Sequence, residues 1–279
     1  MMMVSVIMIT YNHENYIKEA IEGILNQDCD FDYELIIAND CSTDNTNIVI
    51  NDLIRSNKSK VKIEYFNHEV NLGMIPNFVF VLEQSKGKYI AICEGDDYWT
   101  DPLKLQKQVD FLEVNEEYSY CGHQSSELKN DIVRETLIPV KEFTFKELIF
   151  SNLLNTATLL IRKEAISKLP VFFKNVPAGD WALQLIAIKD KKAFVLNDNM
   201  SVYRVHSQGV WSHLDKEEMC MRGVATVEAF KGFYKDNSSK KLINEAIKQR
   251  KKKFGIYKPS LIERGWNKFK RSFLKLILP

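Results

Sequence analysis

The chain has 279 residues, of which 45% are hydrophobic, and a formal net charge of +1. This length and apolar content allow a substantial core in one large domain or two small ones, and they exclude an intrinsically disordered chain. The five cysteines are scattered and form no CxxC pair, which argues against a disulfide framework or zinc site and favours a reducing compartment. Cys121 and His123 have a spacing compatible with a metal corner, but two strand residues are the favoured interpretation.

The chain begins with an apolar segment that has no basic leader and no small-residue cleavage site. We therefore expect a first core strand over residues 4–10 rather than a signal peptide. No apolar run approaches the roughly 20 residues that a membrane-spanning helix needs, so no span is expected.

The first half alternates short β-rich runs with helical patterns. Strands are expected over residues 4–10, 34–39, 61–66 and 89–94, and helices over 15–27, after Ser42-Thr43-Asp44, near 76–84 and after Asp101-Pro102. In the last of these helices, Asp101 is expected as the N-cap and Pro102 at the first helical position. Buried strands separated by helices are typical of a parallel α/β sheet, in which ligands bind beyond the carboxyl ends of the strands.

The second half is less regular. We expect an extended segment over 132–138, a short helix over 145–150, a strand over 156–162, a helix over 181–189, and two short strands over 193–196 and 201–205. From residue 215 onward the pattern is helical.

The end of the chain is strongly basic. Residues 248–279 carry eleven Lys or Arg and one acid, giving +10 and leaving −9 for residues 1–247. From residue 261, apolar and aromatic side chains recur every three or four residues among basic ones, which is typical of an amphipathic helix at a membrane surface. We expect this tail to bind the anionic membrane surface, at about 1 kcal/mol per basic residue. The alternatives are a solvated charged face or a helix packed on a protein; the acidic body and absent RNA-binding motifs argue against nucleic acid.

Polar clusters follow three of the expected strands, at Tyr11-Asn12, at residues 39–44 and at residues 94–99. They would converge at one edge of the sheet. The adjacent carboxylates Asp96 and Asp97 are costly at a buried strand end unless a cation compensates them, and Mg²⁺ or Mn²⁺ with oxygen ligands would do so. The alternative is a solvated Asp-Asp turn before a helix.

Four segments of the sequence, in this order, resemble glycosyltransferase family 2, a family of inverting enzymes with the GT-A fold. They are residues 4–12, residues 34–44, Asn71-Leu72-Gly73 and Glu94-Gly95-Asp96-Asp97, and the resemblance spans about residues 3–120 with weaker matches to about 212. It points to bacterial enzymes that build capsule, O-antigen or wall polysaccharides. It implies a GT-A catalytic domain over 1–214, with a Rossmann-like, mostly parallel sheet flanked by helices. Residues 1–120 would form its nucleotide-binding half and 121–214 its acceptor-binding half, with 215–279 as a helical extension.

The resemblance implies a donor site at the matching positions. Thr10 and Tyr11 would lie at the nucleotide, with Tyr11 against the base. Asp40 would accept a hydrogen bond from an imide N–H, which favours a UDP- or dTDP-sugar. The family often has acids at both 39 and 40, whereas here the first is Asn39. Asn71 would contact the donor. The structural alternatives are a rim aromatic for Tyr11 and a turn former for Asp40.

The resemblance also implies a metal and phosphate site. Asp97 would contact Mn²⁺ or Mg²⁺, and Asp96 would reach the ribose or a metal-bound water. His206 would lie near the metal and diphosphate, and Arg204 would bind the phosphates by charge-assisted hydrogen bonds. Without the resemblance, a histidine after a strand is more often structural.

An inverting reaction needs a carboxylate that takes the proton of the acceptor hydroxyl. This base must be separate from the metal-binding acids, and Asp180 resembles the family's acid at this point in the chain. Its structural alternative is a helix N-cap. Trp99, Trp181 and Trp211 are candidates for stacking on sugars, with core burial as the alternative for each.

Together these features predict a metal-dependent inverting glycosyltransferase. It would move a sugar from a UDP- or dTDP-sugar to the hydroxyl of a lipid-linked glycan, in the cytoplasm and peripheral on the inner face of the cell membrane. A sugar nucleotidyltransferase is one alternative, but no Gly-rich basic loop follows the first strand. A catalytically inactive sugar-nucleotide-binding scaffold is the other, and the intact Asp97 and Asp180 argue against it.

Overall fold

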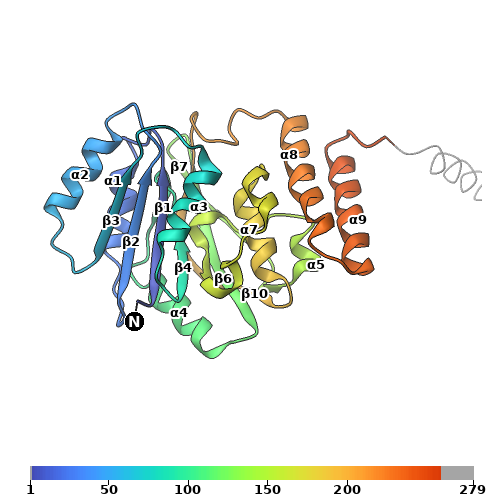
Figure 1. Ribbon diagram of the computed structural model, residues 1–279, viewed down its shortest axis with the longest axis horizontal. Coiled ribbons are helices and arrows are strands. Elements are labelled where there is room, and N and C mark those ends of the chain that lie inside the picture. Colours follow the sequence, from blue (N-terminus) through green and yellow to red (C-terminus); the bar gives the residue numbers. More distant parts are fainter. Residues whose placement is uncertain (1, 259–279) are drawn as a thin grey trace, which may run out of the picture.

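A computed structural model describes residues 2–258, and within that range ten strands form one sheet (Figure 1). The strands are β1 (Val4–Thr10), β2 (Tyr33–Asn39), β3 (Lys62–Asn67), β4 (Tyr89–Ile92), β5 (Tyr98–Trp99), β6 (Tyr118–Lys129), β7 (Ile132–Thr136), β8 (Glu142–Phe143), β9 (Leu160–Arg162) and β10 (Lys192–Val205). Their order is β3-β2-β1-β4-β9-β6-β10-β5, with β7 paired to β6 and β8 to β10. Among the pairs of the main path, β9 and β5 run antiparallel to their neighbours and the rest are parallel. The predicted mostly parallel α/β sheet is confirmed.

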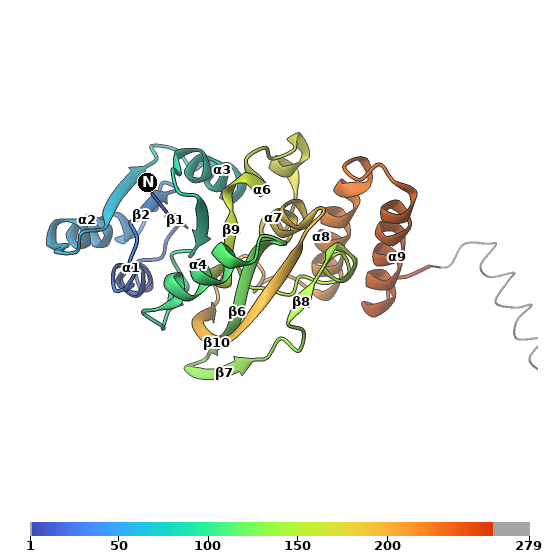
Figure 2. The same cartoon turned by 90° about the horizontal axis from the view of Figure 1, so that it is seen from below.

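Helices cover both faces of the sheet (Figures 1 and 2). They are α1 (Ile17–Leu25), α2 (Thr46–Ser56), α3 (Met74–Gln84), α4 (Lys104–Val114), α5 (Phe145–Leu148), α6 (Lys163–Ile166), α7 (Gly179–Ile188), α8 (Lys216–Ala229) and α9 (Asn237–Lys253). Successive side chains of β1 point to opposite faces of the sheet and belong to two separate apolar layers. Val6 and Met8 pack with α1 and α4, whereas Ile7 packs with α3 and α7. These two layers hold both faces of the central strands out of water.

The register of the parallel strands fixes where polar side chains meet. Thr10 at the end of β1 is the partner of Asn39 in β2, which in turn is the partner of Asn67 in β3. After β4, the amide of Gly95 donates to the Ile9 carbonyl oxygen at 3.0 Å. The three polar clusters therefore leave the sheet at the same edge, as the sequence predicts.

The half that was expected to bind the acceptor, residues 121–214, differs from the expected elements. Apart from the interpretation of Cys121 and His123 as strand residues, the 12-residue strand β6 was not predicted, because its centre is the polar run Gly122 to Ser126 rather than an apolar one. The two strands expected over 193–196 and 201–205 form the single strand β10, which pairs with β6 through irregular register shifts. Residues 156–158 form a 3₁₀ turn, so the expected strand over 156–162 is shortened to β9.

The start of α4 was also predicted wrongly. The helix begins at Lys104 after the N-cap Leu103, so Asp101 and Pro102 precede it. Asp101 instead accepts a 2.8 Å hydrogen bond from the Leu103 amide and pairs with Lys107 at 2.7 Å. This carboxylate stabilises the turn that leads into the helix.

Helices α8 and α9 stand side by side at the end of the molecule opposite β3 and α2 (Figures 1 and 2). Asp215 caps α8 through a capping box, and Asp236 caps α9. Their apolar faces, including Val224, Val227 and Ile243, belong to the same core layer as α7. The boundary expected at residue 214 therefore does not coincide with a break in this layer. No helix within residues 2–258 is long and apolar enough to cross a bilayer, and the expected amphipathic segment from residue 261 lies outside the described range.

Candidate active site

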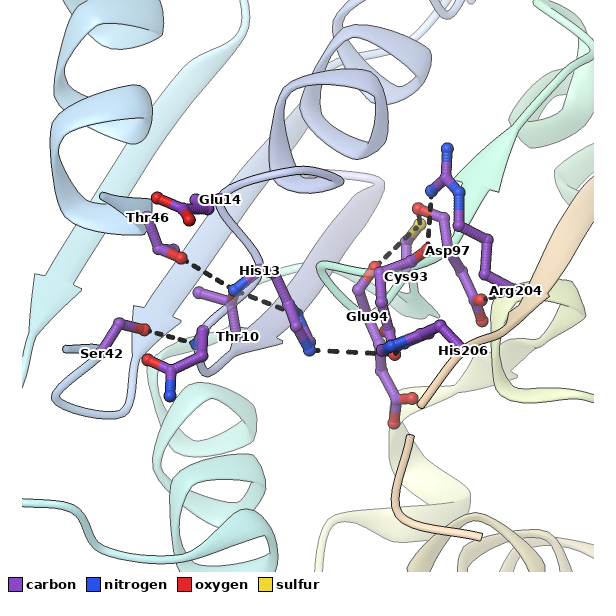
Figure 3. A network of polar contacts seen from close by, with 12 residues as sticks. Thr10, His13, Glu14, Ser42, Thr46, Cys93, Glu94, Asp97, Arg204 and His206 are labelled. Atoms are coloured by element: carbon purple, nitrogen blue, oxygen red, sulfur yellow. Dashed lines mark hydrogen bonds and ion pairs between the residues drawn. The ribbon is translucent and has the colours of Figure 1, made fainter. Parts of the chain in front are cut away.

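Two loops lie together beyond β1 and β2 (Figure 3). The Asn12 amide donates to Ser42 Oγ at 2.9 Å, and the His13 amide donates to Thr46 Oγ1 at 2.8 Å. Asn12 and Cys41 adopt positive φ values of 57° and 60°, which turn each loop sharply out of its strand. The side chains after these strands are thus held at fixed positions.

Asn39 explains why this chain lacks the first of two acids. Its amide nitrogen donates to Asn67 Oδ1 at 2.8 Å, and its amide oxygen accepts from the Ser42 hydroxyl. A carboxylate could accept from Ser42, but it could not donate to Asn67. The buried Asn39 amide is therefore matched to these two neighbours.

A cavity of 280 Å³ lies beside these loops. Thr10, Tyr11, Asp40 and Asn71 all line it, together with Glu94 and Asp96. Tyr11 is 44% exposed and lies at the rim. The structure thus brings the residues predicted for the donor site around one cavity.

Asp40 also orders part of this wall. Its two oxygens accept hydrogen bonds from the Leu72 amide at 2.7 Å and the Gly73 amide at 2.9 Å. Gly73 has a φ of 88°, a conformation that favours glycine, and the Asn71 side chain donates to the Asp40 carbonyl oxygen at 3.0 Å. Asp40 and Asn71 therefore fix the loop after β3 against the cavity.

A second cavity of 310 Å³ adjoins the first, and Glu94 and Asp96 belong to the walls of both. Asp180 lines this second cavity, and its Oδ2 accepts a hydrogen bond from Asn152 Nδ2 at 2.5 Å. The N-cap of α7 is Ala178, so Asp180 is in the first helical turn and the N-cap alternative is wrong. Burial raises the pKa of Asp180, although the hydrogen bonds from Trp181 and Asn152 oppose this effect.

The two adjacent aspartates have different surroundings. Asp96 Oδ2 lies 3.1 Å from His206 Nε2 and 3.8 Å from His13 Nε2, at the cavity walls. Asp97 is 1% exposed and lines neither cavity; its Oδ1 accepts from the Arg204 amide at 2.9 Å, and its Oδ2 has no hydrogen-bond partner. Of the pair, Asp96 has the direct access to ligand.

The carboxylates in this loop perturb one another. Burial raises the pKa of Glu94 to about 8, and the charges of Asp96 and Asp180 add to the effect. Burial, followed by the charges of Asp96 and Glu94, also raises the pKa of Asp97 well above its usual range. For Asp96, burial acts upward, but the His206 hydrogen bond and the nearby histidine charges outweigh it and lower the pKa. The site holds more carboxylates than its own cations compensate.

Arg204 organises this loop. Its Nη1 donates to the Asp96 carbonyl oxygen at 2.6 Å, and its Nη2 forms an ion pair with Glu19. The guanidinium carbon lies 4.3 Å from the centroid of the Tyr98 ring. Arg204 lines the second cavity, but these contacts already occupy its guanidinium.

Gly95 permits the close approach of β1 and the carboxylate loop. A Cβ at this position would lie 2.6 Å from Thr10 Oγ1 and 2.9 Å from His13 Nδ1. Burial lowers the pKa of His13, and the charge of Asp96 opposes the shift. Sequence reasoning missed His13, although it directly follows the predicted Tyr11-Asn12 cluster.

The tryptophan candidates separate into two groups. Trp99 and Trp181 are buried, and their indole nitrogens donate to the carbonyl oxygens of Ala157 and Leu148 at 3.0 and 2.8 Å. Trp181 and Trp211 both line the second cavity, and Trp211 is the more exposed of the two. Cys121 and His123 are buried in β6, as expected of strand residues.

The carboxylate oxygens at the shared wall are suitable ligands for a hard divalent cation. Glu94 and Asp96 provide carboxylate oxygens at the shared wall, and the buried Asp97 Oδ2 behind them has no partner. Within residues 2–258, no three His, Cys, Asp or Glu side chains are grouped to hold a metal ion by themselves. A cation at this wall would therefore need phosphate or water oxygens to complete its shell.

Comparison with known proteins identifies the class. The family model of glycosyl transferase family 2 matches residues 5–166, so the chain belongs to this family. Mycobacterium tuberculosis protein Rv1520 is 33% identical over 212 residues, which are 74% of this chain and 60% of the relative. The chain thus spans about 60% of the length of this relative. A Haemophilus influenzae protein described as an uncharacterized glycosyltransferase is 29% identical over 202 residues, 70% of this chain and 76% of that one.

Solved structures show the same GT-A-like architecture. Residues 1–349 of S. aureus TarS, in complex with UDP-GlcNAc, superpose with a TM-score of 0.68 at 18% identity over 90% of this chain and 72% of that one. The mannosyltransferase PcManGT of Pyrobaculum calidifontis, in complex with GDP-Man and Mn²⁺, gives 0.62 at 14% identity over 97% and 79%. At these identities the likeness concerns the fold.

Proposed function

We propose that the protein is an inverting glycosyltransferase that moves a sugar from a UDP- or dTDP-sugar to a glycan hydroxyl in the synthesis of a bacterial surface polysaccharide. The main support for this proposal is that two adjoining cavities share a wall formed by carboxylates. Asp40 lines the first cavity and Asp180 lines the second. A transfer reaction needs such an arrangement, because donor and acceptor must meet where the bond is exchanged.

In the first cavity, Tyr11 would lie against the base and Asp40 would read its imide N–H. Each Asp40 oxygen already accepts one backbone hydrogen bond, and each retains a second lone pair for the base. The TarS complexes contain UDP or UDP-GlcNAc, which supports a uridine donor. Thr10 and Asn71 would contact the rest of the nucleotide.

Mn²⁺ or Mg²⁺ would be held at the shared wall. We favour Asp96 as its direct ligand, assisted by His206, with Asp97 as the buried carboxylate behind them. The bound cation would stabilise the negative charge of the departing diphosphate. The presence of Mn²⁺ in the PcManGT complex supports this assignment.

In the second cavity, Asp180 would take the proton of the attacking hydroxyl. Burial raises its pKa, which strengthens it as a base, and the hydrogen bond from Asn152 orients the carboxylate. Arg204 would act mainly by fixing the loop that carries Asp96, with a contact to phosphate as a second role.

The test is incubation with Mn²⁺ and UDP-glucose, UDP-galactose or their N-acetyl forms. Slow release of UDP without acceptor is the expected result. Release of pyrophosphate from UTP and a sugar phosphate would instead identify a nucleotidyltransferase. Binding of UDP-sugars without turnover under any condition would identify an inactive scaffold.

The acceptor would be lipid-linked, with the enzyme held on the inner face of the membrane by its basic tail. The net charge of +10 over residues 248–279 supports this location. Deletion of residues 257–279 should release the protein from vesicles that contain anionic lipid. Binding that persists after the deletion would place the anchor elsewhere.

A further inference from the structure

The second cavity contains a cation that the proposed reaction does not use, Arg250 of α9. Its guanidinium carbon lies 5.0 Å from the centroid of the Trp181 ring and 5.7 Å from that of Phe254. Trp181 is itself fixed by its hydrogen bond to the Leu148 carbonyl oxygen. A guanidinium placed against aromatic rings in this way keeps its N–H donors at its edge, where they can bind another group.

Nothing in the described part of the chain neutralises this charge. Within residues 2–258, Arg250 has no ion-pair partner, and its buried Nε has no hydrogen-bond partner. Arg204, in the same cavity, is instead paired with Glu19 and bonded to the Asp96 carbonyl oxygen. A partly buried charge without a partner is unfavourable, so Arg250 is suited to a negative group that the ligand brings.

Helix α8 leaves space for this guanidinium. A Cβ on Gly223 would lie 2.1 Å from Arg250 Nε and 2.2 Å from its Cζ. Even alanine at this position would push the guanidinium away. A glycine weakens the interior of a helix, and here it permits the observed position of Arg250.

We propose that Arg250 binds a phosphate or carboxylate group of the acceptor, so that the acceptor is an anionic glycan or polyol. This inference rests on the proposed function and specifies its acceptor. Asp180 and Arg250 line the same cavity, which would place the reacting hydroxyl and the negative group of one acceptor between them. Arginine suits both oxyanions because its N–H groups can form two parallel hydrogen bonds to them.

The charge distribution of the protein supports a specific role for Arg250 in binding an anionic acceptor. Residues 1–247 carry a net charge of −9, and Glu94, Asp96 and Asp180 line the same cavity as Arg250. An anionic acceptor would be repelled by such a surface unless a cation received it. Arg250 is placed to do so.

The experiment measures binding rather than turnover. Ligand-detected NMR would follow methyl glucuronide, methyl glucoside 6-phosphate and neutral methyl glucoside, each with UDP and diamagnetic Mg²⁺ present. The wild-type protein should bind at least one of the two anionic probes tenfold or more tightly than methyl glucoside, and the preferred probe tells carboxylate from phosphate. Arg250→Gln should abolish this preference, and Gly223→Ala should reproduce the loss without changing the net charge.

Lys253→Gln is the matched control, because it removes one positive charge from an exposed position on the same helix. It should leave the preference unchanged. The proposal is overturned if neither anionic probe is preferred by the wild-type protein, or if the preference survives in Arg250→Gln. Should Arg250→Gln not fold, Arg250→Lys and Gly223→Ala decide the question.

UDP binding separates this proposal from the one on which it rests. The affinity for UDP with Mn²⁺ should be the same in the wild-type protein and in Arg250→Gln. If Arg250→Gln loses as much affinity for UDP as for the anionic probe, Arg250 belongs to the donor site, and its proposed role in binding the acceptor is overturned. Absence of UDP binding in the wild-type protein would instead contradict the glycosyltransferase proposal.

Discussion

The carboxylate wall makes a quantitative prediction about pH. Burial and the charges of Asp96 and Asp180 raise the pKa of Glu94 from its usual 4.5 to about 8. A carboxyl group whose pKa is higher in the folded state stabilises that state fully below pH 4.5, and the contribution is lost as the pH rises through 8. The difference between these two pKa values corresponds to a contribution of at most about 5 kcal/mol to the free energy of unfolding. About 3 kcal/mol of it would be lost between pH 5 and pH 8.

Glu94→Gln removes this titration. We expect the free energy of unfolding of the wild-type protein, measured by urea denaturation in EDTA, to fall by about 3 kcal/mol more than that of Glu94→Gln between pH 5 and pH 8. Mn²⁺ with UDP should reduce the fall, because a bound cation favours the ionised carboxylate. Glu69→Gln, the same change at an exposed position, is the control. Parallel pH profiles for the wild-type protein and Glu94→Gln would refute the reasoning.

Three further predictions concern the site. Asp180→Asn should lower kcat by about 10² to 10⁴ while UDP affinity stays within a factor of two; normal turnover would eliminate it as the base. Asp96→Asn should remove most of the Mn²⁺ dependence of UDP binding in calorimetry, whereas Asp97→Ala tests the original assignment of the metal anchor. If only Asp97→Ala removes that dependence, Asp97 rather than Asp96 is the ligand. Gly95→Ala should lower the melting temperature and UDP affinity together, because its Cβ would meet Thr10 Oγ1 at 2.6 Å; a variant with normal binding would show that the loop can shift freely.

The donor side was predictable because its signals are local. A buried parallel strand is a short apolar run, and the polar residue that ends it marks the ligand edge. Tyr11, Asp40 and Asp96 were found in this way, and the register of β1, β2 and β4 brings their segments together. The family resemblance added roles to these positions and contributed Asn71, which the strand pattern had not selected.

The part of the chain after residue 120 was less predictable because its signals are not local. Strand β6 has a polar centre, so no apolar run marks it. The difference between Asp96 and Asp97 depends on the Arg204 amide, 107 residues away from Asp97 in the chain. Arg250 belongs to a basic run in which the sequence does not distinguish one charge from the next; contact with Trp181 and Gly223 does.

The shared core of α7, α8 and α9 has a consequence for how members of this family diverge. The family model matches residues 5–166, whereas Gly223 and Arg250 lie beyond that match. Substitutions in the last two helices therefore reshape one pocket while β1 to β4 and their loops stay as they are. Under the proposed function, a lineage could exchange its acceptor in this way and retain an inherited apparatus for the activated sugar.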